Sequence, residues 1–104
     1  MYWTIHCLDK PNTSEVRQRV LGAHLAYVAS ASLHVVLAGP LLGETGSSPS
    51  GSLLIVEADQ ISEVEAFAIG APFAAAGLWD SIRIDAFAPT PHWPATSTER
   101  GQMP

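Results

Sequence analysis

The chain has 104 residues, of which 47% are hydrophobic and 14% charged, so it has the size of one domain with one core. Ten acidic residues against five lysines and arginines give a net charge of -5, which argues against nucleic-acid binding, because that needs a clustered basic face. The single cysteine, Cys7, excludes an intramolecular disulfide framework and a cysteine-based metal site. The N-terminus has no signal-peptide pattern and no apolar run reaches membrane-span length, so we expect a soluble cytoplasmic protein with no membrane partner.

The first third of the chain predicts a strand followed by a helix. Residues 2–8 are rich in aromatic and β-branched side chains and stop at a turn-forming segment. Asn12 and Glu15 have the spacing of a capping box, which predicts a helix from this point to about Ser32. Apolar side chains recur along this helix every three or four residues, which indicates one buried stripe. The stripe consists of Val16, Val20, Leu21, His24, Tyr27, Val28 and Ala31.

The rest of the chain predicts three more strands, at residues 34–38, 52–58 and 79–87. The first of them is expected to stop before Gly39-Pro40, and a Gly- and Ser-rich loop at 43–51 precedes the next. Ser62 and Glu65 form a second capping-box pattern, which predicts a helix that ends near Ile69. One more helical turn is expected shortly afterwards, within residues 73–78.

The order strand, helix, strand, strand, helix, strand predicts a ferredoxin-like α+β domain over residues 1–88, with a four-stranded antiparallel sheet and two helices on one face. The strands at 2–8 and 52–58 carry apolar residues on both sides, so the second face also needs a cover. Because no chain is left to provide it, we expect a homodimer, or a multiple of one, joined through sheet faces. Residues 89–104 predict a Pro-rich tail that is extended or disordered unless it docks, with Trp93 over a pocket or a partner.

The residue with the strongest claim to chemistry is His24, which lies within the apolar stripe of the first helix. It is either a general acid/base, whose pKa burial and a neighbouring carboxylate tune towards neutrality, or a core histidine satisfied by one hydrogen bond. Asp9 ends the first strand. It is either the orienting partner of His24 or a turn aspartate that bonds its own backbone.

Further candidates are mainly aromatic. Tyr27, Phe73 and Trp79 either stack on a ring-shaped substrate or pack in the core. His6 alternates with Trp3 and so faces the opposite side of the sheet, where it lines a cavity between two subunits or is a hydrogen-bonded structural histidine. The histidines and acids lack metal-ligand spacing, and no glycine-rich motif supports a nucleotide. We therefore expect neither a metal nor an organic cofactor.

Several short motifs, taken in order, resemble those of the YciI-like (YCII-related) family over about residues 2–88. They are Asp9-Lys10-Pro11, Arg17 leading to Ala23-His24-Leu25, Ala38-Gly39-Pro40-Leu41, Gly51-Ser52, Ala71-Pro72-Phe73 with Ala76-Gly77-Leu78, and a last strand ending at Phe87. The resemblance implies a dimeric α+β barrel with a small cleft around a histidine–aspartate pair. Muconolactone isomerases share this general architecture, and one member of the family is a chlorohydroxyhydroquinone dehydrochlorinase.

Carried over residue by residue, the family histidine is His24, with Arg17 among the residues that would bind substrate. The family aspartate, which precedes Pro-Phe, is Ala71 here, and an arginine often found three residues before the histidine is Leu21. Asp9 or another group then supports His24, or the histidine works alone, or the chain is not catalytic. The expected function is cofactor-independent proton transfer on a ring substrate, by dehydrochlorination or lactone isomerisation in aromatic degradation. The alternative is a non-catalytic ligand-binding or accessory module with a structural histidine.

Overall fold

The computed structural model describes residues 1–44, 46 and 48–90 of the chain. The predicted tail from residue 91 onward, with Trp93, lies outside the described residues, as do positions 45 and 47 of the predicted loop. The elements in chain order are β1 (Tyr2–Asp9), α1 (Ser14–Ala29), β2 (His34–Leu42), β3 (Pro49–Glu57), α2 (Ile61–Ile69), α3 (Pro72–Ala75) and β4 (Trp79–Phe87). Within the described residues, no helix is both long and apolar enough to cross a bilayer.

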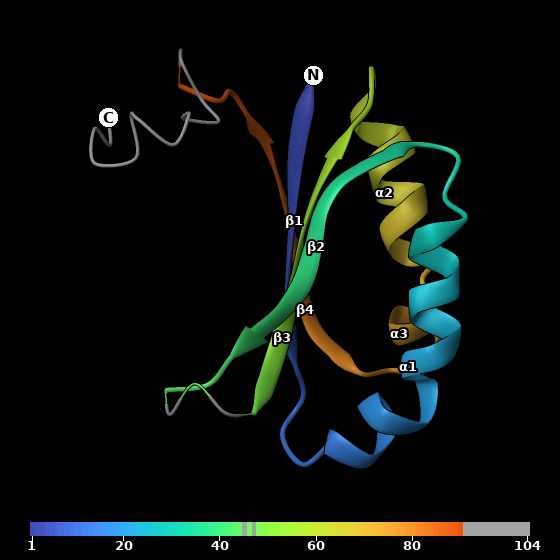
Figure 1. The fold of residues 1–104 in the computed structure, drawn as a ribbon, viewed down its shortest axis with the longest axis vertical. Coiled ribbons are helices and arrows are strands. Elements are labelled where there is room, and N and C mark those ends of the chain that lie inside the picture. The colour runs from blue at the N-terminus through green and yellow to red at the C-terminus, as the bar shows by residue number, and fades with distance from the viewer. Residues whose placement is uncertain (45, 47, 91–104) are drawn as a thin grey trace, which may run out of the picture.

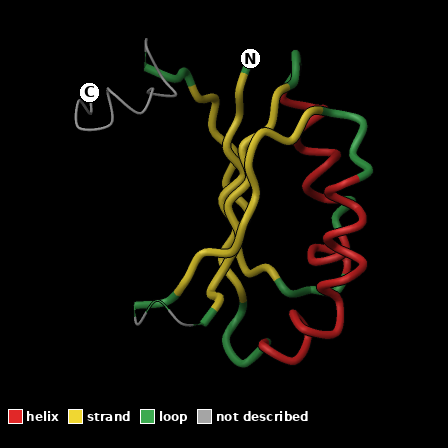
Figure 2. The backbone as a smooth tube through the Cα atoms, in the orientation of Figure 1, coloured by secondary structure: helices red, strands yellow, loops and turns green. Residues whose placement is uncertain are grey.

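The four strands form one sheet in the order β2-β3-β1-β4, and every neighbouring pair is antiparallel. All three helices lie on one face of this sheet (Figure 1). The opposite face carries no helix in the described part of the chain (Figure 2). The predicted ferredoxin-like α+β arrangement is therefore confirmed.

The core lies between the sheet and the helices, and the alternation of β1 shows why. Trp3, Ile5 and Cys7 point towards the helices and are buried, whereas the residues between them are less buried. Successive side chains of a strand point to opposite faces, so a central strand with helices on one side buries every second residue. These three residues pack in one cluster with Leu54 and Val56 of β3, which occupy the same face.

The start and end of α1 differ from the prediction. Asn12 does not cap the helix, because it adopts a left-handed conformation with φ of 60° in the preceding turn, which asparagine tolerates better than most residues. Thr13 is the N-cap residue. Its hydroxyl donates to the Lys10 carbonyl and accepts no hydrogen bond from the helix. The helix ends at Ala29, three residues before the predicted Ser32. Ala31 of the predicted stripe therefore lies beyond the helix.

The capping box of α2 exists, but two residues earlier than predicted. The Gln60 side chain accepts from the N3 backbone, and the Glu63 carboxylate accepts from the Gln60 backbone N–H at 3.0 Å. The predicted pair Ser62 and Glu65 does not form the box, because the helix already begins at Ile61. The short α3, with Pro72 in its first turn, confirms the extra helical turn.

Strands β2 and β3 are longer than predicted. β2 continues through Gly39 and Pro40 to Leu42, and β3 begins at Pro49. A proline interrupts a central strand because it cannot donate a hydrogen bond, but β2 is an edge strand, where that donor is not needed on the outer side. β3 therefore takes up residues 49–51 of the predicted loop.

The sheet face opposite the helices, called here the open face, is apolar mainly over β2 and β3, whereas β4 carries the exposed ion pair of Arg83 and Asp85 on it. The register places Leu37 of β2 beside Ile55 of β3, and Ile55 beside Thr4 of β1. Leu37 is 64% exposed, and Leu8 and Phe87 on the same face are each about two-fifths exposed. The predicted apolar residues on both sides of β1 and β3 are thus confirmed, and the described residues of a single chain leave this face without a cover (Figure 2).

Gly51 marks a point of close approach between β1 and β3, and its replacement by alanine is expected to be destabilising. A Cβ atom at this position would collide with the carbonyl oxygen of Cys7, which is backbone and cannot move aside. We expect Gly51→Ala to lower the free energy of unfolding by about 1–3 kcal/mol, the usual cost of overpacking. Urea denaturation measures this difference.

Gly22→Ala is the matched control for that substitution. A Cβ atom at Gly22, within α1, would meet nothing within 4 Å. Because alanine favours helix over glycine, this variant should be more stable than the wild type by roughly 1 kcal/mol. Equal stability of the Gly51→Ala variant and the wild type would contradict the close approach.

Candidate functional site

A buried ion pair joins the first strand to the first helix. The Arg17 guanidinium donates to the Asp9 carboxylate through Nε at 2.8 Å and Nη2 at 2.9 Å. Both side chains are more than nine-tenths buried. This bidentate geometry is the strongest kind of arginine–carboxylate contact, so it holds the guanidinium plane in one orientation.

The same arginine also bonds to β3. Its Nη2 donates to the carbonyl oxygen of Gly51 at 2.9 Å and to the hydroxyl of Ser52 at 3.1 Å. The guanidinium carbon lies 4.7 Å from the centre of the Phe73 ring, within cation–π range. Arg17 therefore joins the end of β1, the start of β3 and helix α3 at a single point.

His24 lies two helical turns after Arg17 and contacts the same aromatic ring. Its imidazole stacks on Phe73 with ring centres 3.8 Å apart and an interplanar angle of 11°, and it meets Trp79 edge to face. The side chain is 6% exposed. Within the described residues its Nδ1 atom is buried without a hydrogen-bond partner. The core-histidine interpretation, which required one hydrogen bond, is therefore not what these residues show.

The electrostatic environment of His24 differs from the prediction. Burial, and secondly the positive charge of Arg17, lower the pKa of His24 from its ordinary 6.5 to about 4. We had expected a neighbouring carboxylate to tune this pKa towards neutrality, but the carboxylate of Asp9 bonds to Arg17. His24 is consequently a neutral imidazole at neutral pH.

An apolar pocket opens beside these residues, between α1 and strands β2 and β3, and is called here the His24 pocket. Its volume is about 400 Å³, which suits a small organic molecule. Arg17, Gln18, His24 and Ser52 supply its polar groups. Its apolar walls are formed by Leu21, Leu25, Val28, Ala29, Ala38, Gly39, Pro40, Pro49, Leu54 and Phe73.

Leu21 was predicted within the buried stripe, but it is 40% exposed. Its neighbour Leu25 is more exposed still, and both line the His24 pocket. The pocket explains why both leucines are exposed. Their side chains form part of its apolar wall and do not pack in the core.

The structure separates the other predicted site residues into distinct places. Trp79 packs against His24 and Phe73 within the core. His6 lies on the open face, opposite Arg83 in the register and away from the pocket. Of the five predicted substrate-binding residues, Arg17 and Phe73 are thus the two that line the His24 pocket. Trp79 does not line it but packs against two residues that do, His24 and Phe73.

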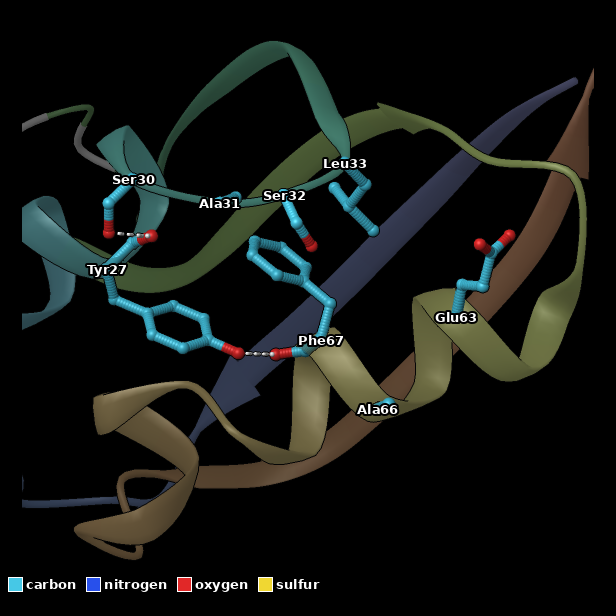
Figure 3. A pocket seen from close by; sticks show the side chains of 8 residues that line it. All are labelled: Tyr27, Ser30, Ala31, Ser32, Leu33, Glu63, Ala66 and Phe67. Atoms are coloured by element: carbon cyan, nitrogen blue, oxygen red, sulfur yellow. Dashed lines mark hydrogen bonds between the residues drawn. The ribbon is translucent and has the colours of Figure 1, made fainter.

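Tyr27 belongs to a different cavity. Its hydroxyl donates to the Phe67 carbonyl of α2 at 2.8 Å, and its ring stacks on that of Phe67 (Figure 3). These two side chains line an open cleft between the end of α1 and α2, together with residues such as Ser30 and Glu63 (Figure 3). Tyr27 therefore joins the two helices instead of contacting a ligand beside His24.

Sequence reasoning missed Ser52, and it missed the pairing of Arg17 with Asp9. One signal was available for the arginine. Residues seven apart lie two turns apart on the same side of a helix, so Arg17 and His24 share one face. A charged residue on the buried face of a helix needs a partner. Glu15 is two residues away and so faces another side of the helix, which leaves Asp9 as the nearby carboxylate. Ser52 belongs to the Gly51-Ser52 motif of the family resemblance, but that motif does not by itself assign the hydroxyl a place in the site.

No metal-binding cluster occurs in the described ranges, since no group of three or more His, Cys, Asp or Glu side chains gathers there. Cys7 is fully buried, and burial raises the pKa of its thiol to about 12. The thiol is therefore an unreactive part of the core.

The lowered pKa of His24 makes stability dependent on pH. The unfolded chain binds a proton at the ordinary pKa near 6.5, whereas the folded chain binds it near 4. Between these values the unfolded state holds more protons, so the free energy of unfolding should fall by roughly 3 kcal/mol as the pH drops from 6.5 to 4. Urea denaturation at a series of pH values measures it.

The His24→Phe variant is the comparison for this pH dependence. Phenylalanine keeps the ring that stacks on Phe73 but cannot bind a proton, so the part of the pH dependence between 4 and 6.5 that His24 causes should disappear. Identical slopes for the two proteins would contradict the lowered pKa.

The fold and the pocket define a class of protein: a ferredoxin-like α+β domain with a histidine–arginine pocket between its first helix and its sheet. The family model described as the YCII-related domain matches residues 1–88, and the chain belongs to this family. The protein YciI of Escherichia coli O6:H1 is 29% identical over 96 residues, which cover 84% of this chain and 96% of that protein.

Solved structures agree with this assignment. The 5-chloro-2-hydroxyhydroquinone dehydrochlorinase of Burkholderia phenoliruptrix AC1100, in complex with 2,5-dihydroxybenzoquinone, superimposes with a TM-score of 0.80. It is 31% identical, and the match covers 88% of this chain and 98% of that one. A protein of Agrobacterium tumefaciens, 12% identical over 92% of this chain and 100% of that one, has a TM-score of 0.55 and shares the fold alone.

Proposed function

We propose that the protein is a cofactor-independent enzyme that moves protons on a small ring substrate, with His24 as the general acid/base. The observation that carries the proposal is a neutral, buried imidazole at an apolar pocket of ligand size, beside an arginine held in place by Asp9. A neutral imidazole is ready to accept a proton, and the guanidinium stabilises the negative charge that the proton leaves behind.

Dehydrochlorination of a chlorinated hydroxyhydroquinone is the reaction proposed for this arrangement. His24 takes the proton of one ring hydroxyl and gives it to the ring carbon that bears chlorine, which forms the keto tautomer. A second hydroxyl then loses its proton while chloride leaves with the bonding electron pair, so the products are a quinone and HCl. No oxidant is required, because the electron pair departs with the chloride.

The likeness to the Burkholderia dehydrochlorinase supports this reaction class, since the match covers nearly all of that chain. In this proposal Asp9 is a positioning residue that acts through Arg17, and His6, Tyr27 and Trp79 do not contact the substrate. Isomerisation of a lactone would need the same proton transfer.

Release of chloride from 5-chloro-2-hydroxyhydroquinone by the purified protein tests the proposal. Chloride and the quinone product should appear in equal amounts, without added metal or cofactor. Chloride release no faster than in a buffer blank would reject dehydrochlorination, and a parallel assay with a muconolactone would test the isomerase form of the proposal.

A non-catalytic ligand-binding module is the second candidate, and one observation favours it. The family aspartate position holds Ala71, and the carboxylate of Asp9 serves Arg17, so no carboxylate bonds to His24 within the described residues. A protein that binds 2,5-dihydroxybenzoquinone in this pocket but turns over neither substrate would fit this candidate.

We also propose that the protein is a homodimer that works in the cytoplasm and buries the open face against a second copy. The support is the apolar patch around Leu37, Ile55 and Phe87, because monomers rarely expose a large contiguous apolar surface. Light scattering at micromolar concentration is expected to give twice the chain mass of 11.0 kDa. A mass near 11.0 kDa would contradict the dimer.

The Ile55→Lys variant should shift this equilibrium towards the monomer, because it buries a charge at the centre of the proposed interface. Ile69→Lys is its control. Ile69 lies at the end of α2, is 70% exposed and is not on the open face. The control should keep the wild-type mass.

A further inference from the structure

The open cleft between the end of α1 and α2, called here the α1–α2 cleft, is separate from the His24 pocket. Its volume is about 720 Å³, and it shares no lining residue with that pocket. The lining residues come from the end of α1, the segment after it and one side of α2 (Figure 3). A cavity of this size can hold a small organic molecule. It plays no part in the reaction proposed above.

The charged groups that line this cleft are negative. Among its described lining residues Glu63 alone carries a formal charge, and none is a lysine or an arginine. Burial raises the pKa of Tyr27, so its hydroxyl stays neutral. Helix α1 ends beside the cleft at Ala29, with no basic residue in its last turn. Because a helix C-terminus carries a partial negative charge, it favours a cation there as Glu63 does.

Glu63 has one carboxylate oxygen left for a ligand. Its Oε2 accepts from the backbone N–H groups of Asp59 and Gln60 at 3.1 and 3.0 Å, as part of the cap of α2. No hydrogen bond joins Oε1 to the described part of the chain. The cap therefore holds the carboxylate in place before a ligand arrives, and Oε1 remains as an acceptor.

The ring of Phe67 provides a second contact for a cation. Phe67 lies four residues after Glu63, which places the two side chains on one side of α2. Its ring points from α2 towards the segment after α1, and the Tyr27 ring stacks beside it with 5.2 Å between ring centres (Figure 3). An aromatic face attracts a cation within about 6 Å of its centre. A carboxylate and an aromatic ring one helical turn apart therefore suit a positively charged nitrogen.

Other charged ligands fit these groups less well. An anion would meet a carboxylate and no basic residue. A divalent metal ion needs several oxygen ligands, whereas Glu63 is the one carboxylate among the described lining residues and no His or Cys accompanies it. An ammonium group has three N–H donors, which match Oε1 of Glu63 and the hydroxyl of Ser32 at the same cleft.

We propose that the α1–α2 cleft binds a small organic ammonium ion, with its charged nitrogen between Oε1 of Glu63 and the face of the Phe67 ring. The apolar stem of the ligand then lies against Leu33, which lines the same cleft. This is a second ligand site, independent of the reaction proposed for the His24 pocket. Its selectivity for a positive charge comes from Glu63.

Two small molecules of nearly equal size test the proposal by NMR titration at pH 7. Phenethylamine is an ammonium ion at this pH, whereas 2-phenylethanol has the same ring and chain with a neutral hydroxyl in place of the amine. The amine should shift the backbone amide signals of residues 30–33 and 63–67 to saturation. It should bind about tenfold more tightly than the alcohol. Added salt should reduce this preference, because it screens an exposed ion pair.

Glu63→Gln removes the charge and keeps the cap, because a glutamine oxygen accepts the same backbone N–H bonds. Glu65→Gln is its matched control, since Glu65 is exposed on the same helix and does not line the cleft. The preference for the amine should fall below about threefold in Glu63→Gln and keep the wild-type value in Glu65→Gln.

Three results would overturn the inference. They are equal binding of the amine and the alcohol to the wild-type protein, amide shifts that do not saturate or that lie at the His24 pocket instead, and an equal loss of preference in the two glutamine variants.

Discussion

Replacing His24 by phenylalanine is expected to lower turnover by roughly a hundred- to ten-thousand-fold, the usual contribution of a general acid/base. Phenylalanine keeps an aromatic ring on Phe73, where the imidazole lies 3.8 Å from the ring centre, so the packing of α1 on α3 is retained. It cannot take a proton from a ring hydroxyl. The measurement is the rate of chloride release under single-turnover conditions, with folding checked by circular dichroism.

His34→Phe is the control for this substitution, because His34 is an exposed histidine at the start of β2 and does not line the pocket. It should keep wild-type turnover. A His24→Phe protein that is folded and fully active would reject the mechanism. An unfolded His24→Phe protein would instead show a structural role, and His24→Gln would then be the variant in which to measure turnover.

Loss of the Arg17 side chain is expected to have the largest effect on stability. Arg17→Met leaves the carboxylate of Asp9 buried without its partner, and the Gly51 carbonyl and the Ser52 hydroxyl each lose a donor. Breaking a buried ion pair from one side usually costs about 3–5 kcal/mol of unfolding free energy. Urea denaturation at pH 7 measures this loss.

The exposed pair Arg83–Asp85 provides the matched control. Its Nε–Oδ2 distance of 2.9 Å is nearly that of the buried pair, but its side chains are 77% and 50% exposed. Arg83→Met should therefore cost less than about 1 kcal/mol. If Arg17→Met and Arg83→Met lowered the free energy of unfolding by similar amounts, burial would not be what makes the Arg17–Asp9 pair important for stability.

A double variant separates the charge from the packing. Arg17→Met combined with Asp9→Leu removes both charges, so it should recover part of the stability that Arg17→Met loses. Recovery would show that the unpaired carboxylate causes most of the loss. A double variant no more stable than Arg17→Met would assign the loss to the bonds with β3.

The spacing of apolar residues along the chain determined the order of the strands and helices and the fold class. The alternation of Trp3, Ile5 and Cys7 predicted a strand with one face on the core, and the spacing of Val16, Val20 and His24 predicted the helix that covers it. These periods follow directly from strand and helix geometry, so the element order and the fold class were readable from the residues. The element ends were less accurate, because caps such as Thr13 and Gln60 depend on the turn that precedes them.

The sequence also identified His24, Arg17 and Phe73 as candidates before any contact was known. It did not establish which of them meet. Asp9 was paired with His24 in the prediction because a strand end can reach the adjacent helix, whereas the structure pairs it with Arg17. A guanidinium binds a carboxylate strongly through two parallel N–H groups, which an imidazole cannot offer.

Only the tertiary structure decided the protonation state of His24 and the shape of its pocket. A histidine in a helix has an ordinary pKa until the chain surrounds it, and here the surroundings come from distant segments: Phe73 of α3, Trp79 of β4 and the β2 edge. Desolvation depends on every atom that replaces water around the ring, and that set is assembled by long-range packing. The sequence spacing of His24 therefore placed it on the buried face of α1, while folding lowered its pKa.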